Sequence, residues 1–180
     1  MSDEIYEAVY SSLRRAIVHT STFSENGLAM RAGLATLDVL EDEQLGAWAT
    51  YLGKRLRQGL TAALSRFEMF ASTPGIGLLS GIEFKPPSSL ALRVPFTAFR
   101  TIHSGLFAHM LVMRLFRSER VLTQVCGNNF MVLKSAPPLV AEEQHIDLFV
   151  EAMERILTDV HDSGSFWADA LALARRARNI

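Results

Sequence analysis

The 180-residue chain carries 49% hydrophobic and 21% charged residues, which is typical of a globular protein rather than a disordered one. Its formal net charge of −1 gives no support for a nucleic-acid partner. The single cysteine, Cys126, excludes an internal disulfide framework, and no apolar run is long enough to span a bilayer. The first residues lack the basic start and apolar core of a signal peptide, so we expect a cytoplasmic protein.

The first part of the chain is predicted to be helical. Apolar residues recur at helical spacing over 2–15, 24–40 and 42–67. The helix over 24–40 carries two apolar stripes, which indicates burial on more than one side. If residues 1–40 belong to a larger domain, they cannot bury their apolar stripes alone, and the chain on its own is expected to aggregate or to bind a hydrophobic dye.

Further along the chain the hydrophobic period changes from that of a helix to that of a strand. Alternation predicts strands at 69–72, 78–84, 121–125 and 130–135, while residues 88–96 are predicted to form a loop because of an extended segment around Pro95. Helices are predicted at 97–118, 142–160 and 165–178. The order predicts an α+β fold, with a small, mainly antiparallel sheet and helices on one face.

Hydroxyl side chains gather before the second helix. Ser21 and Thr22 lie in an extended segment that leads to Ser24, a favourable N-cap residue. Hydroxyls and backbone N–H groups at such a junction form an anion site, into which a phosphate fits without a nearby lysine. The alternative is that Ser24 only caps the helix and the other two residues solvate a loop.

Three stretches resemble one family in the same order along the chain. His19–Phe23 with Asn26–Ala29 is similar to the segment of class III, pyridoxal-phosphate-dependent aminotransferases in which a Ser/Thr-Thr-Phe/Tyr step precedes Gly-Gly-Asn-Pro-Leu-Ala. Gly75–Phe84 resembles their Gly-x-Gly-Leu-x-x-Gly-Ile-Glu strand, and Lys134–Val140 resembles their Arg-x-x-Pro-Pro-Leu-Val segment. The resemblance is to the ornithine, putrescine and acetylornithine group, and only to its C-terminal part.

The resemblance implies a cofactor, a partner and a domain division. Ser21 and Thr22 would contact the phosphate of pyridoxal 5'-phosphate across the interface of a homodimer, and Lys134 would face the substrate. Residues 1–40 would end the large cofactor-binding domain and include the connecting helix. Residues 41–160 would form the small C-terminal domain, and residues 161–180 a helical extension to which the family assigns no role.

The sequence departs from the family pattern at several positions. Lys134 replaces an arginine and cannot form its bidentate fork, which favours a diamine or other ω-amine donor. The alternative for Lys134 is a charge at a strand end without a ligand. Pro74 and Gly27 also replace the family's arginine and proline.

The family chemistry needs a lysine that binds the cofactor covalently. The chain has three lysines, Lys54, Lys85 and Lys134, and none has the sequence context of that residue. In the resembled family the lysine lies upstream of the hydroxyl segment. We therefore expect the C-terminal part of an aminotransferase, acting on small amines and 2-oxo acids, that is inactive alone.

The other motifs give weaker signals. Gly75 and Gly77 lead into a strand, so a dinucleotide fingerprint is rejected. The five histidines and Cys126 have no metal-ligand spacing, so no metal site is predicted. The alternative to an aminotransferase fragment is a non-catalytic α+β interaction module that descends from the same family.

Overall fold

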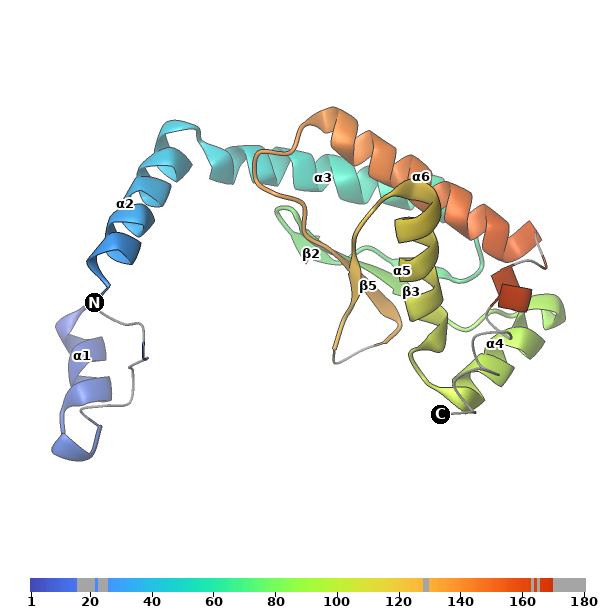
Figure 1. Cartoon of the computed structure of the whole chain (residues 1–180), viewed down its shortest axis with the longest axis horizontal. Helices are drawn as coiled ribbons and strands as arrows, with labels where there is room; N and C mark the ends of the chain where they lie inside the picture. Colours follow the sequence, from blue (N-terminus) through green and yellow to red (C-terminus); the bar gives the residue numbers. More distant parts are fainter. Residues whose placement is uncertain (16–21, 23–25, 128–129, 163, 165, 170–180) are drawn as a thin grey trace. The chain divides into compact units, whose positions relative to one another are not determined.

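The computed structural model describes residues 1–15, 22, 26–127, 130–162, 164 and 166–169. The chain divides into two compact units, Met1–Glu43 and Gln44–Ile180, and each is described by itself. Figure 1 shows both units, with the α-helices α1 to α6 and the strands β2, β3 and β5 labelled. The assignment of residues 1–40 to a large cofactor-binding domain, and of residues 161–180 to an extension, stays a prediction.

The first unit contains only helical elements among its described residues. They are α1 (Asp3–Tyr10), the short 3-10 helix η1 (Leu13–Arg15) and α2 (Gly27–Asp42). The Ser2 side chain caps α1 by accepting a hydrogen bond from the Ile5 N–H at 3.5 Å. The helix predicted over 2–15 is therefore interrupted after Tyr10.

Helix α2 begins at Gly27, and its N-cap is Asn26 rather than Ser24. The Asn26 side-chain oxygen accepts hydrogen bonds from the N–H groups of Leu28 at 3.0 Å and Ala29 at 3.2 Å. Asparagine caps a helix as well as serine does, and the sequence pattern alone did not separate the two.

None of the described residues in α1 or α2 is buried. The leucines of α2 that form its two apolar stripes are largely exposed, with Leu28 at 82% and Leu34 at 55%. A helix that is apolar on two sides is normally covered on two sides. The described part of the first unit thus contains apolar surface that the unit itself does not cover.

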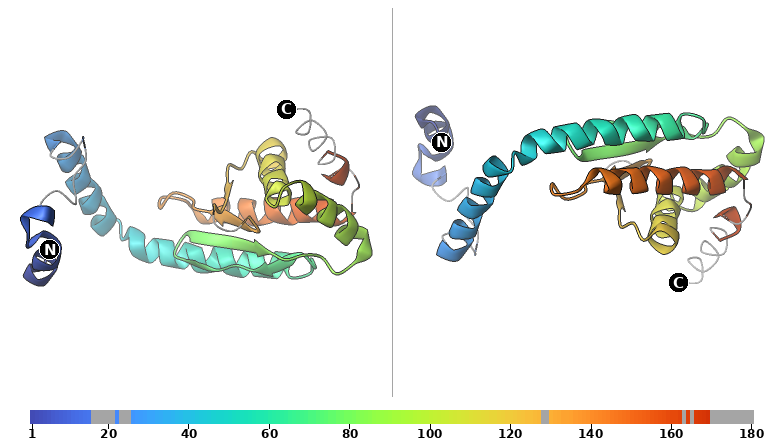
Figure 2. Two further views of the ribbon diagram at one scale, coloured as in Figure 1. Left: turned by 90° about the horizontal axis from the view of Figure 1, so that it is seen from below. Right: turned by 90° about the horizontal axis from the view of Figure 1, so that it is seen from above.

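The second unit begins with α3 (Leu45–Leu64), which follows Gln44 in a left-handed backbone conformation with φ of 51°. Its buried residues recur every three or four positions, as in an amphipathic helix: Leu45, Ala49, Leu52, Leu56, Leu60 and Leu64. Helix α6 (Glu143–Asp162) is its counterpart near the end of the chain. Figure 2 shows these two helices side by side.

Helices α3 and α6 run parallel. Side-chain hydrogen bonds at a separation of 92 positions join the two helical segments, from Tyr51 with Glu143 to Thr158 with Arg66, which lies just after α3. Between them, Arg55 forms an ion pair with Asp147 at 2.6 Å. Because all these pairs are exposed, they set the register of the helices more than they add to stability.

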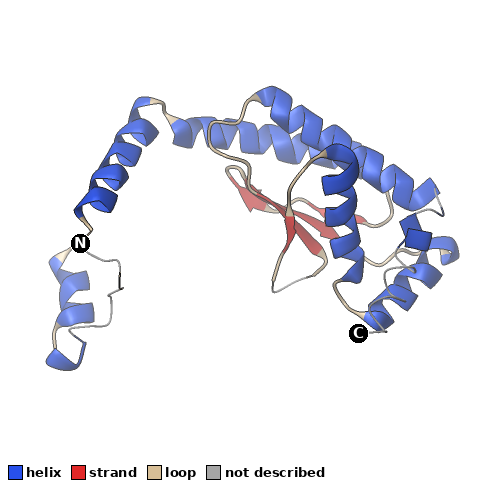
Figure 3. Cartoon of the chain, in the orientation of Figure 1, coloured by secondary structure: helices blue, strands red, loops and turns tan. Residues whose placement is uncertain are grey.

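Five described strands form an antiparallel sheet with the order β1-β3-β5-β4, and β2 pairs with β3 as a hairpin. Figure 3 shows the strands in red among the helices. The bounds are β1 Phe70–Ser72, β2 Gly75–Ile76, β3 Leu79–Phe84, β4 Gln124–Val125 and β5 Val132–Ser135. The predicted α+β class with a small antiparallel sheet is confirmed.

The segment between β3 and β4 differs from the structure predicted for it from the sequence. Residues 88–96 are not a loop, because α4 spans Leu90–Ile102 with Pro95 inside it. Leu92, Phe96 and Phe99 are buried at helical spacing, and this burial outweighs the hydrogen bond that Pro95 cannot donate. The single helix predicted over 97–118 is wrong too, since α5 (Leu106–Glu119) starts anew after a break.

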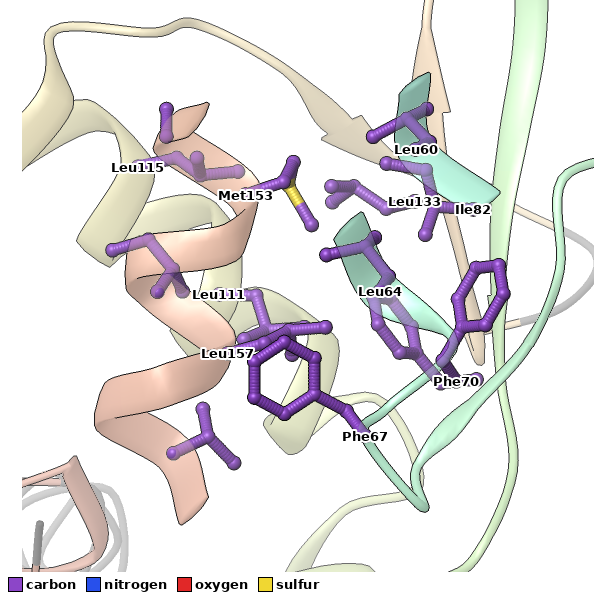
Figure 4. Close-up of a cluster of buried hydrophobic side chains, with 14 of the residues drawn as sticks. Leu60, Leu64, Phe67, Phe70, Ile82, Leu111, Leu115, Leu133, Met153 and Leu157 are labelled. Atoms are coloured by element: carbon purple, nitrogen blue, oxygen red, sulfur yellow. The ribbon is translucent and has the colours of Figure 1, made fainter. Parts of the chain in front are cut away.

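The core lies between one face of the sheet and the helices α3, α5 and α6. Figure 4 shows Leu60 and Leu64 of α3 close to Ile82 and Leu133 of the sheet, with Met153 of α6 among them. Residues on the other face of the same strands are only half-buried. The predicted placement of helices on one face therefore holds for the described strands.

Helical structure continues past the end of α6, and it adds to the core. Phe166 and Trp167 are buried, and the Trp167 indole N–H donates to the Val160 carbonyl at 2.9 Å. Most of the helix predicted over 165–178 lies outside the described residues. No described helix is both long enough and apolar enough to cross a membrane.

Candidate functional site

Two of the three family-like stretches become neighbouring strands. Gly75–Phe84 forms the β2–β3 hairpin, and Lys134 lies on β5, which pairs with β3 (Figure 1). In the antiparallel register Gly81 lies directly opposite Lys134. The fold therefore brings together two motifs that are about fifty residues apart in sequence.

Lys134 belongs to the sheet face that the helices leave open. Leu133 and Ser135 beside it are buried against the core, whereas Lys134 is half-buried on the opposite side. The same open face carries Glu83, whose carboxylate accepts a hydrogen bond from the Ser72 hydroxyl at 2.7 Å. No described carboxylate forms an ion pair with Lys134, so its ammonium group is available to an anion.

A groove of about 350 Å³ lies along the β4 side of Lys134. It is lined by Leu122, Thr123, Gln124, Lys134 and Ala136. The Thr123 hydroxyl donates to the Lys134 carbonyl and joins the two walls of the groove. A space of this size beside an unpaired ammonium group suits a small anionic molecule.

The hairpin next to this face is fixed by a very close approach to α3. A Cβ atom added at Gly53 would lie 1.8 Å from the Gly77 carbonyl oxygen, so only glycine fits there. Gly77 itself has a φ of +50°, which favours glycine. The Arg57 guanidinium of α3 donates to the same carbonyl at 2.8 Å, which ties the hairpin to the helix.

The predicted phosphate contact lies in the first unit. Thr22 is exposed in a turn, whereas Ser21 and Ser24 lie outside the described residues. The first free N–H groups of α2 are already bound by Asn26, so the helix start is less open to an anion than the sequence suggests. A Cβ added at Gly27 would meet nothing within 4 Å, which leaves space beside the helix start. A phosphate here would depend on hydroxyl groups such as that of Thr22.

Neither of the other two lysines lines the groove beside Lys134. Lys54 is exposed in the middle of α3, and Lys85 is exposed just after β3. Within the described ranges, no group of three or more His, Cys, Asp or Glu residues could hold a metal ion.

Sequence reasoning missed two residues of the groove. Gln124 and Thr123 lie on and beside β4, and their contact with Lys134 depends on the register of β4 against β5. No local pattern signals this, because register is set by the pairing of two strands and not by neighbours in the sequence.

Comparisons with known proteins agree with the motif resemblance. A sequence profile of the class III aminotransferases (Aminotransferase class-III) matches residues 1–157. An acetylornithine aminotransferase of Bifidobacterium longum (strain NCC 2705) is 33% identical over 144 residues, which cover 80% of this chain and 28% of that protein. A diaminobutyrate–2-oxoglutarate aminotransferase of Rhizobium meliloti (strain 1021) is 33% identical over 129 residues, which cover 72% of this chain and 26% of that protein.

A solved structure supports the same assignment. A thermostable (S)-enantioselective omega-transaminase of Thermomicrobium roseum matches with a TM-score of 0.68 and 26% identity, over 90% of this chain and 33% of that one. The chain thus spans less than a third of the length of the two curated relatives. Since the family profile matches most of the sequence, this chain belongs to the class III aminotransferase family.

Proposed function

We propose that the chain is the C-terminal part of a pyridoxal-phosphate-dependent aminotransferase. Such an enzyme moves an amino group from an amine or amino acid to a 2-oxo acid. The observation that carries the proposal is the pairing of β3 with β5, because it brings two family motifs together. The family profile also matches residues 1–157 of the same chain. When bound, the cofactor supplies the electron sink for this chemistry.

In this proposal the first unit supplies a contact to the cofactor phosphate. Ser21 and Thr22 donate hydroxyl hydrogen bonds to the phosphate held by the other subunit of a homodimer. The exposed position of Thr22 and the open space beside Gly27 support this role. The uncovered apolar stripes of α2 also support it, since they need a neighbour that the described part of the first unit does not provide.

The second unit supplies one wall of the substrate site. Lys134 attracts the carboxylate of the substrate, and its lack of an ion pair with any described carboxylate supports this role. A lysine is a point charge, so it attracts an anion without fixing its orientation. The substrates are small amines or amino acids and 2-oxo acids, as the names of the relatives indicate for those proteins.

The lysine that binds the cofactor comes from sequence upstream of this chain. Lys54 and Lys85 are exposed and do not line the groove, and Lys134 is assigned to the substrate. The 180 residues alone are therefore inactive as a transaminase. The complete protein acts as a cytoplasmic homodimer.

The intact mass and absorbance of the native gene product test this proposal. A mass well above 20.0 kDa with a chromophore that hydroxylamine releases is the expected result. A mass of 20.0 kDa without a chromophore would overturn it and favour the non-catalytic interaction module.

Substitution of Thr22 tests the phosphate contact in the same product. Thr22→Ala removes one hydrogen bond to a charged group, so cofactor affinity is expected to fall about tenfold. The matched control is Thr36→Ala, because the Thr36 hydroxyl only donates to the Ala32 carbonyl of its own helix at 2.9 Å. Equal cofactor retention by the two variants would count against the assigned contact.

A further inference from the structure

The groove beside Lys134 has a second polar side chain on the same sheet face. Gln124 of β4 lies directly opposite Lys134 of β5 in the antiparallel register. Directly opposed residues have Cβ atoms about 4.5–5.5 Å apart, so their side chains reach the same bound group. Both residues line the groove of about 350 Å³.

Among the described strands, Gln124 is the only residue directly opposite Lys134 that has a side chain. On the other side the opposed residue is Gly81, which has no side chain. Glu83 lies two residues further along β3 and binds the Ser72 hydroxyl at 2.7 Å. Among the described residues, therefore, Gln124 is the group best placed to share a ligand with Lys134.

The chemistry of the two side chains is complementary toward a carboxylate. The ammonium group of lysine is a compact charge that binds one oxygen without fixing the direction of the other. The amide NH₂ of glutamine has two N–H donors, one of which can bind the second oxygen. Together they reproduce the two-point contact that a single arginine makes with a carboxylate.

We propose that Gln124 is a specificity-determining residue that acts with Lys134 to hold both oxygens of the substrate carboxylate. The proposal rests on the proposed function, because it takes Lys134 as a wall of the substrate site. Leu122 and Ala136 also line the groove and contribute apolar side chains. They favour a ligand whose carboxylate is joined to an apolar carbon chain over one that carries a second charge.

The test is a titration of the 180-residue chain with sodium acetate, followed by NMR signals of the Gln124 side-chain amide and the Lys134 methylenes. Acetamide serves as the neutral probe of the same shape, and sodium chloride keeps the ionic strength constant. Acetate is expected to shift both sets of signals, whereas acetamide shifts neither. Gln124→Leu is expected to weaken acetate binding about tenfold, and Gln124→Glu to abolish it by repulsion.

Lys134→Met separates this proposal from the proposed function. If Lys134→Met abolishes acetate binding and Gln124→Leu leaves it unchanged, the role of Gln124 is overturned and that of Lys134 stands. If acetate does not bind, or Lys134→Met binds it as well as the original chain does, both roles are overturned. Gln58→Leu is the matched control, because Gln58 is exposed on α3 and does not line this groove. It is expected to leave acetate binding unchanged.

Discussion

Glu68 illustrates, at the scale of single residues, how one carboxylate positions a helix. Its two oxygens accept four hydrogen bonds from the backbone N–H groups and hydroxyls of Ser88 and Ser89. Ser89 is the N-cap of α4, so Glu68 fixes the entry to that helix as the glutamate of a capping box does. The hydrogen bonds, above all that from the Ser88 hydroxyl, lower the pKa of Glu68 to about 2.

Glu68→Gln is expected to lower the urea midpoint of unfolding at pH 7. The pKa of Glu68 in the folded chain is below its ordinary value of 4.5, so its contribution is present above that pH and disappears as the pH falls toward 2. The difference between the two proteins should therefore shrink from pH 5 to pH 2. Urea unfolding monitored by circular dichroism at each pH measures this difference in midpoint.

Glu151→Gln is the control for this series. Glu151 makes only an exposed pair with Arg155 at 3.4 Å, so its loss is expected to change the midpoint little at any pH. A Glu68→Gln difference that stays constant from pH 7 to pH 2 would contradict the role given to the Glu68 carboxylate.

The residues of the site differ in how far the sequence predicts them. Lys134 is found from its motif because the Pro-Pro step and the flanking strand lie next to it in sequence. Gln124 is not found, because only the β4–β5 register places it opposite Lys134. Glu68 is also missed, since its four donors lie some twenty residues further along the chain.

At the scale of elements, the contact between α3 and the β2–β3 hairpin depends on two glycines. A Cβ at position 53 would overlap the carbonyl carbon and oxygen of Gly77. These are backbone atoms, which cannot move aside cheaply. The hairpin also receives the Arg57 hydrogen bond at 2.8 Å. The position of β3, and with it the open sheet face, therefore depends on Gly53.

Gly53→Ala is expected to destabilise the second unit by about 3 kcal/mol or more, because it overpacks a backbone contact. Gly46→Ala is the matched control in the same helix, where an added Cβ meets nothing within 4 Å. Since alanine favours helix over glycine, the control should gain about 0.5–1 kcal/mol. Thermal unfolding of both variants measures the difference. A loss of less than 1 kcal/mol for Gly53→Ala would contradict the close approach.

Elements with a continuous hydrophobic period are predicted well, and those that depend on tertiary packing are not. Helices α3 and α6 and strand β3 follow their periods over many residues. Helix α4 was missed because Pro95 suggested an extended segment, whereas the burial of three side chains on one helical face stabilises the helix. The N-cap of α2 was placed two residues early because serine and asparagine cap equally well.

At the scale of the whole molecule, the two units differ in how much apolar surface they cover. The second unit has a continuous core, whereas no described residue of α1 or α2 is buried. This difference is what we expect if residues 1–40 end a larger domain, and that assignment stays a prediction. The chain spans 28% and 26% of the length of the two curated relatives.

The chain in solution is expected to bind the dye 8-anilinonaphthalene sulfonate at α2. The double variant Leu28→Gln/Leu34→Gln should lose about half of the dye fluorescence, because it interrupts the exposed stripes. The free energy of unfolding of the second unit should change by no more than about 0.5 kcal/mol, as is usual for surface substitutions. Fluorescence titration and calorimetry measure the two quantities.

Leu148→Gln provides the comparison for the dye experiment. Leu148 is 58% exposed on α6, which is otherwise covered on its apolar face, so this variant should keep the dye fluorescence. Dye binding that is absent, or that is equal in the double variant and the original chain, would contradict the prediction that α2 is uncovered.

The edges of the sheet bear on how the chain associates with itself. β4 has two residues, and β1 has three with an irregular register between Phe70 and Ser72. Amyloid fibrils grow when strands add to a long, regular edge, and neither edge provides one. We therefore expect copies of this chain that associate through α2 to do so helix against helix and not by adding strands to these described edges.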